Sequence, residues 1–164
     1  MNTIDEEAET RPLDVEAMRA SAGRLLGDNP QPLGLDELDR HLSILSGHIQ
    51  LLIPEVEKAA GRRPKDDIPR YCALACVGEA RMKLNIHQQP GAGLGVPYAR
   101  KLGRVLNALL DHYETLGEQT MCLACDRPIR DGDDSMPYDK VSPSGGAARA
   151  GRIHTVCANT IRRG

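Results

Sequence analysis

Apolar residues recur at helical spacing through the first two thirds of the chain. Steps of three and four residues between apolar positions predict a helix from Pro12 to Leu26 and a longer one from Leu35 to Gly61. In the longer segment the steps alternate without interruption, at Leu35, Leu38, Leu42, Leu45, Ile49, Leu52 and Val56. This heptad pattern is typical of a helix that packs along an apolar seam.

Two further helices are expected, over residues 69–86 and 97–116. The first is rich in small residues, which predicts burial against a neighbouring helix: Cys72, Ala73, Ala75, Cys76, Gly78 and Ala80. The second carries another heptad seam, formed by Ala99, Leu102, Leu106, Leu109, Tyr113 and Leu116. Because short connections join the four segments, the pattern predicts an antiparallel four-helix bundle over residues 12–118.

The helical pattern ends at the end of this bundle. Residues 119–164 contain frequent proline and glycine and almost no large apolar side chains, which predicts a separate small module. Within it we expect a short hairpin with strands at 128–129 and 136–138, and then a short helix over 155–162. At the other end of the chain, residues 1–11 are acidic and predict a flexible tail.

The composition agrees with a mainly α fold and excludes several classes of protein. The chain has no phenylalanine or tryptophan, so its core depends on leucine, isoleucine, valine, methionine and alanine. A formal net charge of −2 is not that of a dedicated nucleic-acid-binding protein. No apolar run is long enough to span a membrane, and the acidic start is unlike a signal peptide. We therefore expect a cytoplasmic protein without a membrane partner.

Two pairs of metal-binding residue types lie in the C-terminal module. Two residues separate Cys122 from Cys125, and two separate His154 from Cys157. Each spacing brings two donor atoms to one turn of the chain, and together they make a tetrahedral set that favours Zn²⁺. A module with so few apolar side chains cannot fold by burial alone, so a metal is expected to substitute for a core. Since four protein ligands close the coordination shell, we expect a structural zinc ion.

This arrangement resembles the treble-clef class of zinc modules. The resemblance covers residues 121–161 and rests on Cys122, Cys125, His154 and Cys157. It implies a turn that carries the first pair, a hairpin, and a helix whose start carries the second pair. The motifs of zinc proteases and zinc deaminases are absent, and no histidine lies between Cys125 and His154 to act as in treble-clef nucleases. The sequence therefore favours a non-enzymatic role.

Other candidate residues have simpler interpretations. We interpret Cys72 and Cys76 as small buried residues, and His41 and His48 as the solvated flank of a helical seam. The glycine-rich segment 91–95 is interpreted as a connector, because it lacks the ending of a phosphate-binding loop. Four arginines near the C-terminus are candidate phosphate contacts: Arg149, Arg152, Arg162 and Arg163.

Residues 12–117 resemble a family of small helical actinomycete proteins of unknown function, which is loosely labelled as natural-product-biosynthesis proteins. The likeness lies in the segment DNPQPLGLDELDRHLSILSGHIQLLIPEVE, the Pro-Lys-Asp-Asp linker and the segment ARKLGRVLNALLDHYETLG. The resemblance implies a helical fold and a bacterial host but no particular chemistry. The candidate zinc ligands lie outside it.

The leading hypothesis is a non-enzymatic binding or adaptor protein, in which a structural zinc ion organises a surface for a protein partner. A homodimer is left open. The first alternative is a DNA-associated regulator that uses the four C-terminal arginines. The second is an accessory protein or enzyme of natural-product biosynthesis, with a small-molecule pocket in the bundle lined by Cys72, Cys76, His48 and Tyr113.

Overall fold

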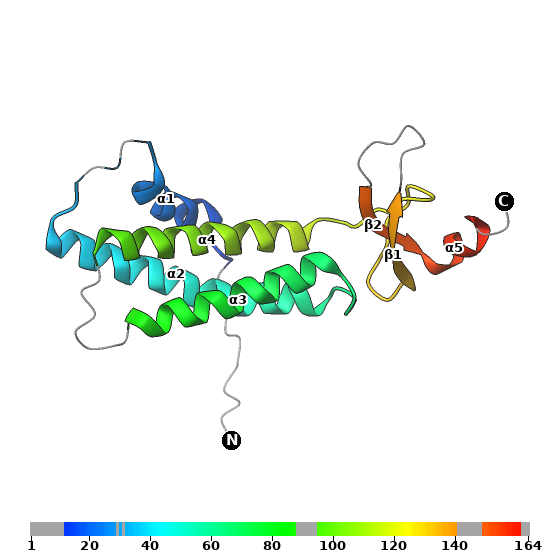
Figure 1. The fold of residues 1–164 in the computed structure, drawn as a ribbon, viewed down its shortest axis with the longest axis horizontal. Helices are drawn as coiled ribbons and strands as arrows, with labels where there is room; N and C mark the ends of the chain where they lie inside the picture. The colour runs from blue at the N-terminus through cyan, green and yellow to red at the C-terminus, as the bar shows by residue number, and fades with distance from the viewer. Residues whose placement is uncertain (1–11, 29, 31, 88–94, 141–148, 162–164) are drawn as a thin grey trace, which may run out of the picture.

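The computed structural model describes residues 12–28, 30, 32–87, 95–140 and 149–161, so the acidic segment 1–11 lies outside the described residues. The described chain is mainly helical, with five helices and one two-stranded sheet (Figure 1). The elements are α1 (Val15–Leu26), α2 (Leu35–Gly61), α3 (Ile68–His87), α4 (Val96–Gly117), β1 (Ser135–Lys140), β2 (Arg149–His154) and α5 (Thr155–Ile161).

The helix ends follow local chemistry. Helix α1 begins at Val15 rather than Pro12, because the side chain of Asp14 accepts a hydrogen bond of 2.9 Å from the backbone N–H of Ala17. Gly27 follows its last turn, and the N–H of this glycine donates to the carbonyl oxygen of Gly23. Helices α2 and α4 both begin after a glycine, and both end where the apolar heptad pattern ends. The seams thus predicted the two longest helices correctly.

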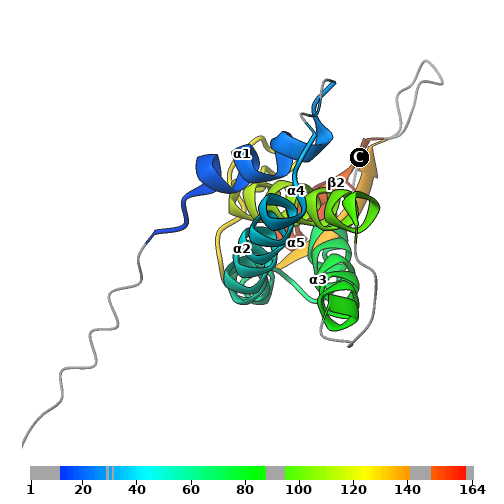
Figure 2. The same cartoon turned by 90° about the vertical axis from the view of Figure 1, so that its left-hand side faces the viewer.

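Helices α1 to α4 pack around one core, and Figures 1 and 2 show α1 and α3 lying against the α2–α4 pair. The largest fully buried side chains of this body come mostly from the two seams: Leu45, Ile49, Leu52, Val56, Val77, Leu102, Leu106, Leu109 and Leu110. Among the described residues, no helix combines the length and the apolar character needed to cross a bilayer.

Two interpretations of helical residues are corrected. His41 is buried rather than solvated, because its Nε2 atom lies 2.9 Å from the carbonyl oxygen of Ser21 in the neighbouring helix α1. Helix α3 is buried on one face only: Ala73 and Ala80 face the core, whereas Cys72 is exposed to solvent. The small residues of α3 therefore do not all pack within the chain.

The predicted hairpin is wrong in its pairing. Strand β1 pairs antiparallel with β2, and Ser135 lies opposite His154. Pro128 instead forms an isolated bridge with Met121. Strand β2 was not predicted from the sequence, because its first three residues are Arg149, Ala150 and Gly151, which carry no β-branched or aromatic side chain.

Truncation of a seam residue tests this core. Leu106→Ala is expected to lower the free energy of unfolding by about 3 kcal/mol, because it leaves a cavity among fully buried side chains. Leu51→Ala is the control, since Leu51 on α2 is 60% exposed and should change stability by less than about 1 kcal/mol. Urea unfolding followed by circular dichroism at the helical minimum measures both, and equal effects would contradict the assigned core.

Candidate metal centre

The first ligand pair lies in a tight turn. The N–H of Asp126 donates to the carbonyl oxygen of Cys122, and the N–H of Cys122 donates to that of Arg127, both at 2.9 Å. Asp126 has a φ of 54°, which places it in the left-handed region that a short polar residue tolerates. This turn brings Cys122 and Cys125 to the same side of the chain.

The second pair comes from the junction of β2 and α5. His154 is the last residue of β2, and Cys157 lies in the first turn of α5. The turn that holds the first pair is fastened to β2, because the N–H of Leu123 donates to the carbonyl oxygen of Arg152 at 3.0 Å. The strand therefore holds the two pairs side by side, although 28 residues separate them in the sequence.

The donor atoms of Cys122, Cys125, His154 and Cys157 all lie within 4.8 Å of one another. The Nδ1 atom of His154 is 3.5 Å from the Sγ atom of Cys125 and 3.8 Å from that of Cys157. Tetrahedral zinc with ordinary bond lengths places nitrogen and sulfur ligands about 3.6 Å apart. The four residues thus form a cluster with the spacing that a single metal ion requires.

The imidazole of His154 is oriented for ligation through Nδ1. Its other nitrogen, Nε2, lies 3.3 Å from the carbonyl oxygen of Pro128 and 3.8 Å from a carboxylate oxygen of Asp133. A carbonyl oxygen can only accept, so Nε2 carries the proton and Nδ1 presents its lone pair to the sulfurs. Histidine ligands of metals commonly have such a second partner.

The cysteines differ in how readily they ionise. Burial raises the pKa of the Cys122 thiol, but N–H groups of His154, Ala124 and Cys125 outweigh it and lower the pKa to about 6. Desolvation raises the pKa of Cys157 to about 11, and the neighbouring thiols Cys125 and Cys122 add to the increase. A thiolate at Cys157 is thus disfavoured beside the other two cysteines, and a bound cation would favour it.

The module has a very small apolar core. Its buried residues are Cys122, Ile153 and Ala158, and one of these is itself a candidate ligand. The backbone at Gly151 approaches Leu123 so closely that a Cβ atom there would lie 2.7 Å from a terminal carbon of that leucine. Burial of so few side chains offsets only a small part of the conformational entropy that the module loses on folding.

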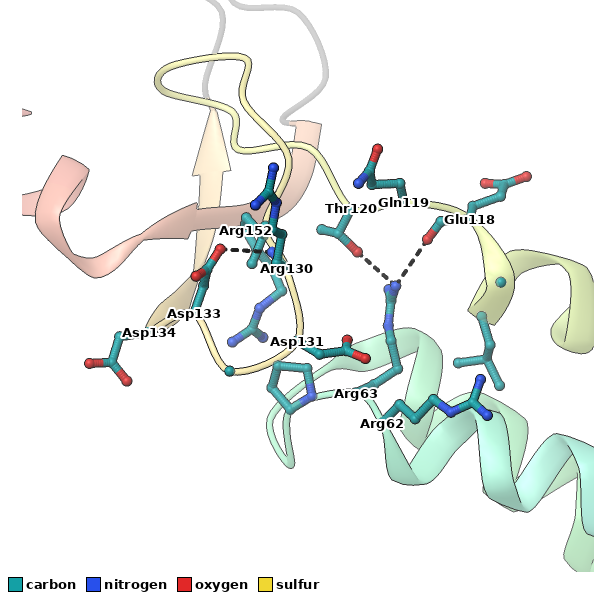
Figure 3. A pocket seen from close by; sticks show the side chains of 15 residues that line it. Arg62, Arg63, Glu118, Gln119, Thr120, Arg130, Asp131, Asp133, Asp134 and Arg152 are labelled. Atoms are coloured by element: carbon teal, nitrogen blue, oxygen red, sulfur yellow. Dashed lines mark hydrogen bonds between the residues drawn. The ribbon is translucent and has the colours of Figure 1, made fainter.

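The module is joined to the helical body by two buried arginines. Arg152 of β2 forms a 2.9 Å ion pair with Asp66 and also donates to Ser135. Arg63 forms a 2.9 Å ion pair with Asp67. Arg63 also donates to the hydroxyl of Thr120 at 2.7 Å and to the carbonyl oxygen of Glu118, as Figure 3 shows. The 62–67 loop after α2 therefore contacts both the module and the segment that leads to it.

A cleft of about 780 Å³ lies at this junction (Figure 3). Its wall includes charged side chains of both signs, and five of them have no ion-pair partner among the described residues: Arg62, Glu118, Arg130, Asp131 and Asp134. A second cleft of about 680 Å³ shares part of this wall and reaches the ligands Cys125, His154 and Cys157. One side of the cluster therefore faces solvent.

The other candidate residues lie apart from the cluster. Of the C-terminal arginines, Arg152 is buried and paired within the chain, Arg162 and Arg163 lie outside the described residues, and Arg149 begins β2. Neither cleft is lined by the residues proposed for a small-molecule pocket, Cys72, Cys76, His48 and Tyr113. Sequence reasoning missed the contacts Arg63–Thr120 and Arg152–Asp66, because each joins segments that are distant in the sequence.

The model of a family of unknown function, DUF6415, matches residues 16–118. This match covers more than half of the chain, so the protein belongs to that family. Its description states no activity, host or pathway. The match includes α1 to α4 and ends before the first cysteine of the cluster, so the candidate metal centre lies in a C-terminal extension of the matched region. Neither curated proteins nor solved structures give a significant match.

Removal of one buried carboxylate tests the junction. Asp67→Ala is expected to destabilise the protein by about 3 kcal/mol, because it leaves Arg63 without its ion pair and removes an acceptor for the N–H of Arg70. Asp66→Ala is the matched control. Its carboxylate is largely exposed, so a loss of at most about 1 kcal/mol is expected in the same urea unfolding measurement. A larger loss for Asp66→Ala than for Asp67→Ala would contradict this account.

Proposed function

We propose that this protein is a non-enzymatic adaptor in which a structural Zn²⁺ ion organises a treble-clef-like module at one end of an antiparallel four-helix bundle. The observation that carries the proposal is the approach of three sulfurs and one imidazole nitrogen to within 4.8 Å. Thiolate and imidazole donors favour zinc over harder cations. Four protein ligands leave no open coordination position for a substrate, so the ion is structural.

The order of elements around the cluster supports the treble-clef assignment. A turn with two cysteines is followed by the β1–β2 hairpin, and α5 then follows His154 directly. In this arrangement the metal would join the turn to the start of the helix. Because zinc held by thiolates suits a reducing compartment, we also propose that the protein acts in the cytoplasm.

The junction cleft is the proposed surface for a protein partner. Arginine and acidic side chains without ion-pair partners among the described residues both lie in its wall, and this mixture of charges suits a protein surface better than a nucleic acid. The metal-organised module forms one wall and the 62–67 loop forms another, so loss of the ion would disturb the surface. The DNA-binding alternative is less well supported, since Arg152 is paired with Asp66.

Metal analysis tests the centre directly. The purified wild type is expected to contain one zinc ion per chain, and the double variant Cys122→Ser, Cys125→Ser is expected to contain almost none. The matched control is Cys72→Ser, Cys76→Ser, which removes two thiols from α3 and should retain the ion. Elemental analysis by mass spectrometry measures all three. Equal zinc in wild type and in the Cys122→Ser, Cys125→Ser variant would refute the site.

Metal binding is expected to depend on pH through the thiols. At pH 7 the low pKa of about 6 leaves Cys122 mostly ionised, whereas the pKa of about 11 leaves Cys157 protonated. Binding of Zn²⁺ should therefore release at least one proton at pH 7. Below pH 6 the affinity for Zn²⁺ should fall, because Cys122 is then mostly protonated as well. Calorimetric titrations in two buffers of different ionisation enthalpy measure the proton count. Binding without proton release would contradict thiolate ligation by Cys157.

The adaptor role requires a partner that depends on the module. Affinity capture from cells that produce the protein is expected to recover a protein with the wild type. The recovery should fall at least tenfold with Cys122→Ser, Cys125→Ser and with the charge reversal Arg62→Glu, Arg130→Glu. Arg104→Glu on α4 is the control, because Arg104 is exposed and lies outside the cleft wall. Capture that is unchanged in all variants would contradict the proposed surface.

A further inference from the structure

The outward face of α3 is apolar along nearly its whole length. At steps of three and four residues it exposes side chains that form the α3 stripe, defined here as Ile68, Tyr71, Ala75, Gly78, Met82 and Ile86. Tyr71 is 77% exposed and Met82 is 66% exposed. A Cβ atom added at Gly78 would meet nothing within 4 Å. The stripe is therefore open in the single chain.

This helix is unusual within the protein because both of its faces are apolar. Its inner face fills the core with Ala73, Val77, Ala80 and Leu84. Helix α4 shows the ordinary pattern instead, with Lys101, Arg104, Asp111 and Glu114 on its exposed side. A helix that is apolar on all sides is normally buried on all sides. The α3 stripe accordingly has the character of a surface that another molecule covers.

Three of the four Arg, Lys and Glu side chains of α3 form ion pairs within the chain. Glu79 pairs with Lys83 one turn away in the same helix. Arg81 pairs with Glu57 of α2 at 2.8 Å. Arg70 has no ion-pair partner among the described residues, but it is not one of the six stripe residues. Those six residues carry no charge, and an equally apolar helix face would complement them.

We propose that the α3 stripe binds the same stripe of a second copy of the chain, in an antiparallel pair about a twofold axis. The stripe has large side chains toward both ends and small residues at its centre. In an antiparallel pairing centred between Ala75 and Gly78, Ala75 of each copy lies opposite Gly78 of the other copy. It also sets Tyr71 against Met82 of the second copy. The small centre lets the two helix axes approach to about 8 Å, and the contact is self-complementary, as a twofold interface requires.

The area of the stripe is sufficient for a dimer of moderate affinity. From residue 68 to residue 86, 18 steps of about 1.5 Å give a stripe about 27 Å long. A fully buried aromatic side chain accounts for about 150–250 Å². The partly exposed Tyr71 and the five smaller residues of the stripe together offer roughly 600 Å² per copy on the same scale. The pair would bury about 1,200 Å², which lies at the lower end of standard interfaces. The dimer is therefore expected to dissociate on dilution.

This interface is independent of the proposed metal centre. The stripe lies on α3, within the region that the family model matches, whereas the candidate ligands lie after residue 118. A zinc-free variant such as Cys122→Ser, Cys125→Ser is thus expected to dimerise like the wild type. Failure of either proposal leaves the other intact.

Sedimentation equilibrium of the full chain tests the dimer, over concentrations from about 1 to about 200 µM. The wild type is expected to approach twice the mass of one chain at the upper end. Met82→Glu should raise the dissociation constant at least tenfold, because it places a charge in the apolar contact. The matched control is Leu51→Glu, which changes a similarly exposed side chain of α2 and should leave the dissociation constant unchanged.

A second variant separates dimer loss from misfolding. Gly78→Leu meets open space in the single chain and suits a helix interior better than glycine, so the fold should be retained. In the dimer the new side chain would force the helices apart, so the dissociation constant should again rise at least tenfold. Circular dichroism and zinc content check the fold of each variant.

Three results would overturn the proposal. If the wild type stays monomeric at the highest concentration, the α3 stripe does not bind a second copy, and a different protein would have to cover it. A dimer that survives both Met82→Glu and Gly78→Leu would place the contact elsewhere on the chain. A dimer that is lost in Leu51→Glu would place it on α2.

Discussion

Four donor atoms from two distant parts of the chain converge in the C-terminal segment, and the rest of its described residues are arranged around them. Cys122 and Cys125 come from one turn, and His154 and Cys157 from the end of β2 and the start of α5. The buried apolar cluster in the described part of the segment has three residues, Cys122, Ile153 and Ala158, so burial contributes little against its conformational entropy. The hydrogen bond from the N–H of Leu123 to the carbonyl oxygen of Arg152 can form only while these two parts lie together.

The helical body and the module depend on each other through one short loop. Arg63 and Asp67 form a buried pair within the 62–67 loop, and this pair positions Arg63 to reach Thr120. Asp66 reaches Arg152, two residues before the ligand His154. The Arg63–Asp67 pair restricts the geometry of the loop, since loss of the buried Asp67 carboxylate would leave Arg63 without its ion pair. The loop thus fixes where the ligand strand lies relative to α2 and α3.

The sequence predicted the four long helices from the spacing of their apolar residues, and the heptad seams of α2 and α4 also indicated which side of each helix is buried. The pattern from Leu35 to Val56 gave the bounds of α2, and Gly117 marked the end of α4. The four candidate ligands could be found from spacing and residue type alone. By contrast, strand β2 escaped detection because it gains its structure from pairing with β1 and not from its own residues.

Contacts between distant segments and surface faces were harder to predict. The small residues of α3 predicted close helix packing, yet Ala75 and Gly78 face outward. A one-dimensional pattern shows that a face is apolar, but it cannot show whether the neighbour belongs to the same chain. Arg152 was interpreted as a phosphate contact because a sequence shows its charge and not its partner Asp66.

The connection between the two parts also limits how far they can separate. Helix α4 ends at Gly117, and the bridge between Met121 and Pro128 marks the start of the module. Only residues 118–120 connect the two. An extended chain spans at most about 3.5 Å per residue, which gives this tether a reach of about 10 Å. Even with both arginine contacts broken, the module could swing about the end of α4 but could not travel to the opposite pole of the helices. Whatever engages both parts at once must therefore approach from that one end of the molecule.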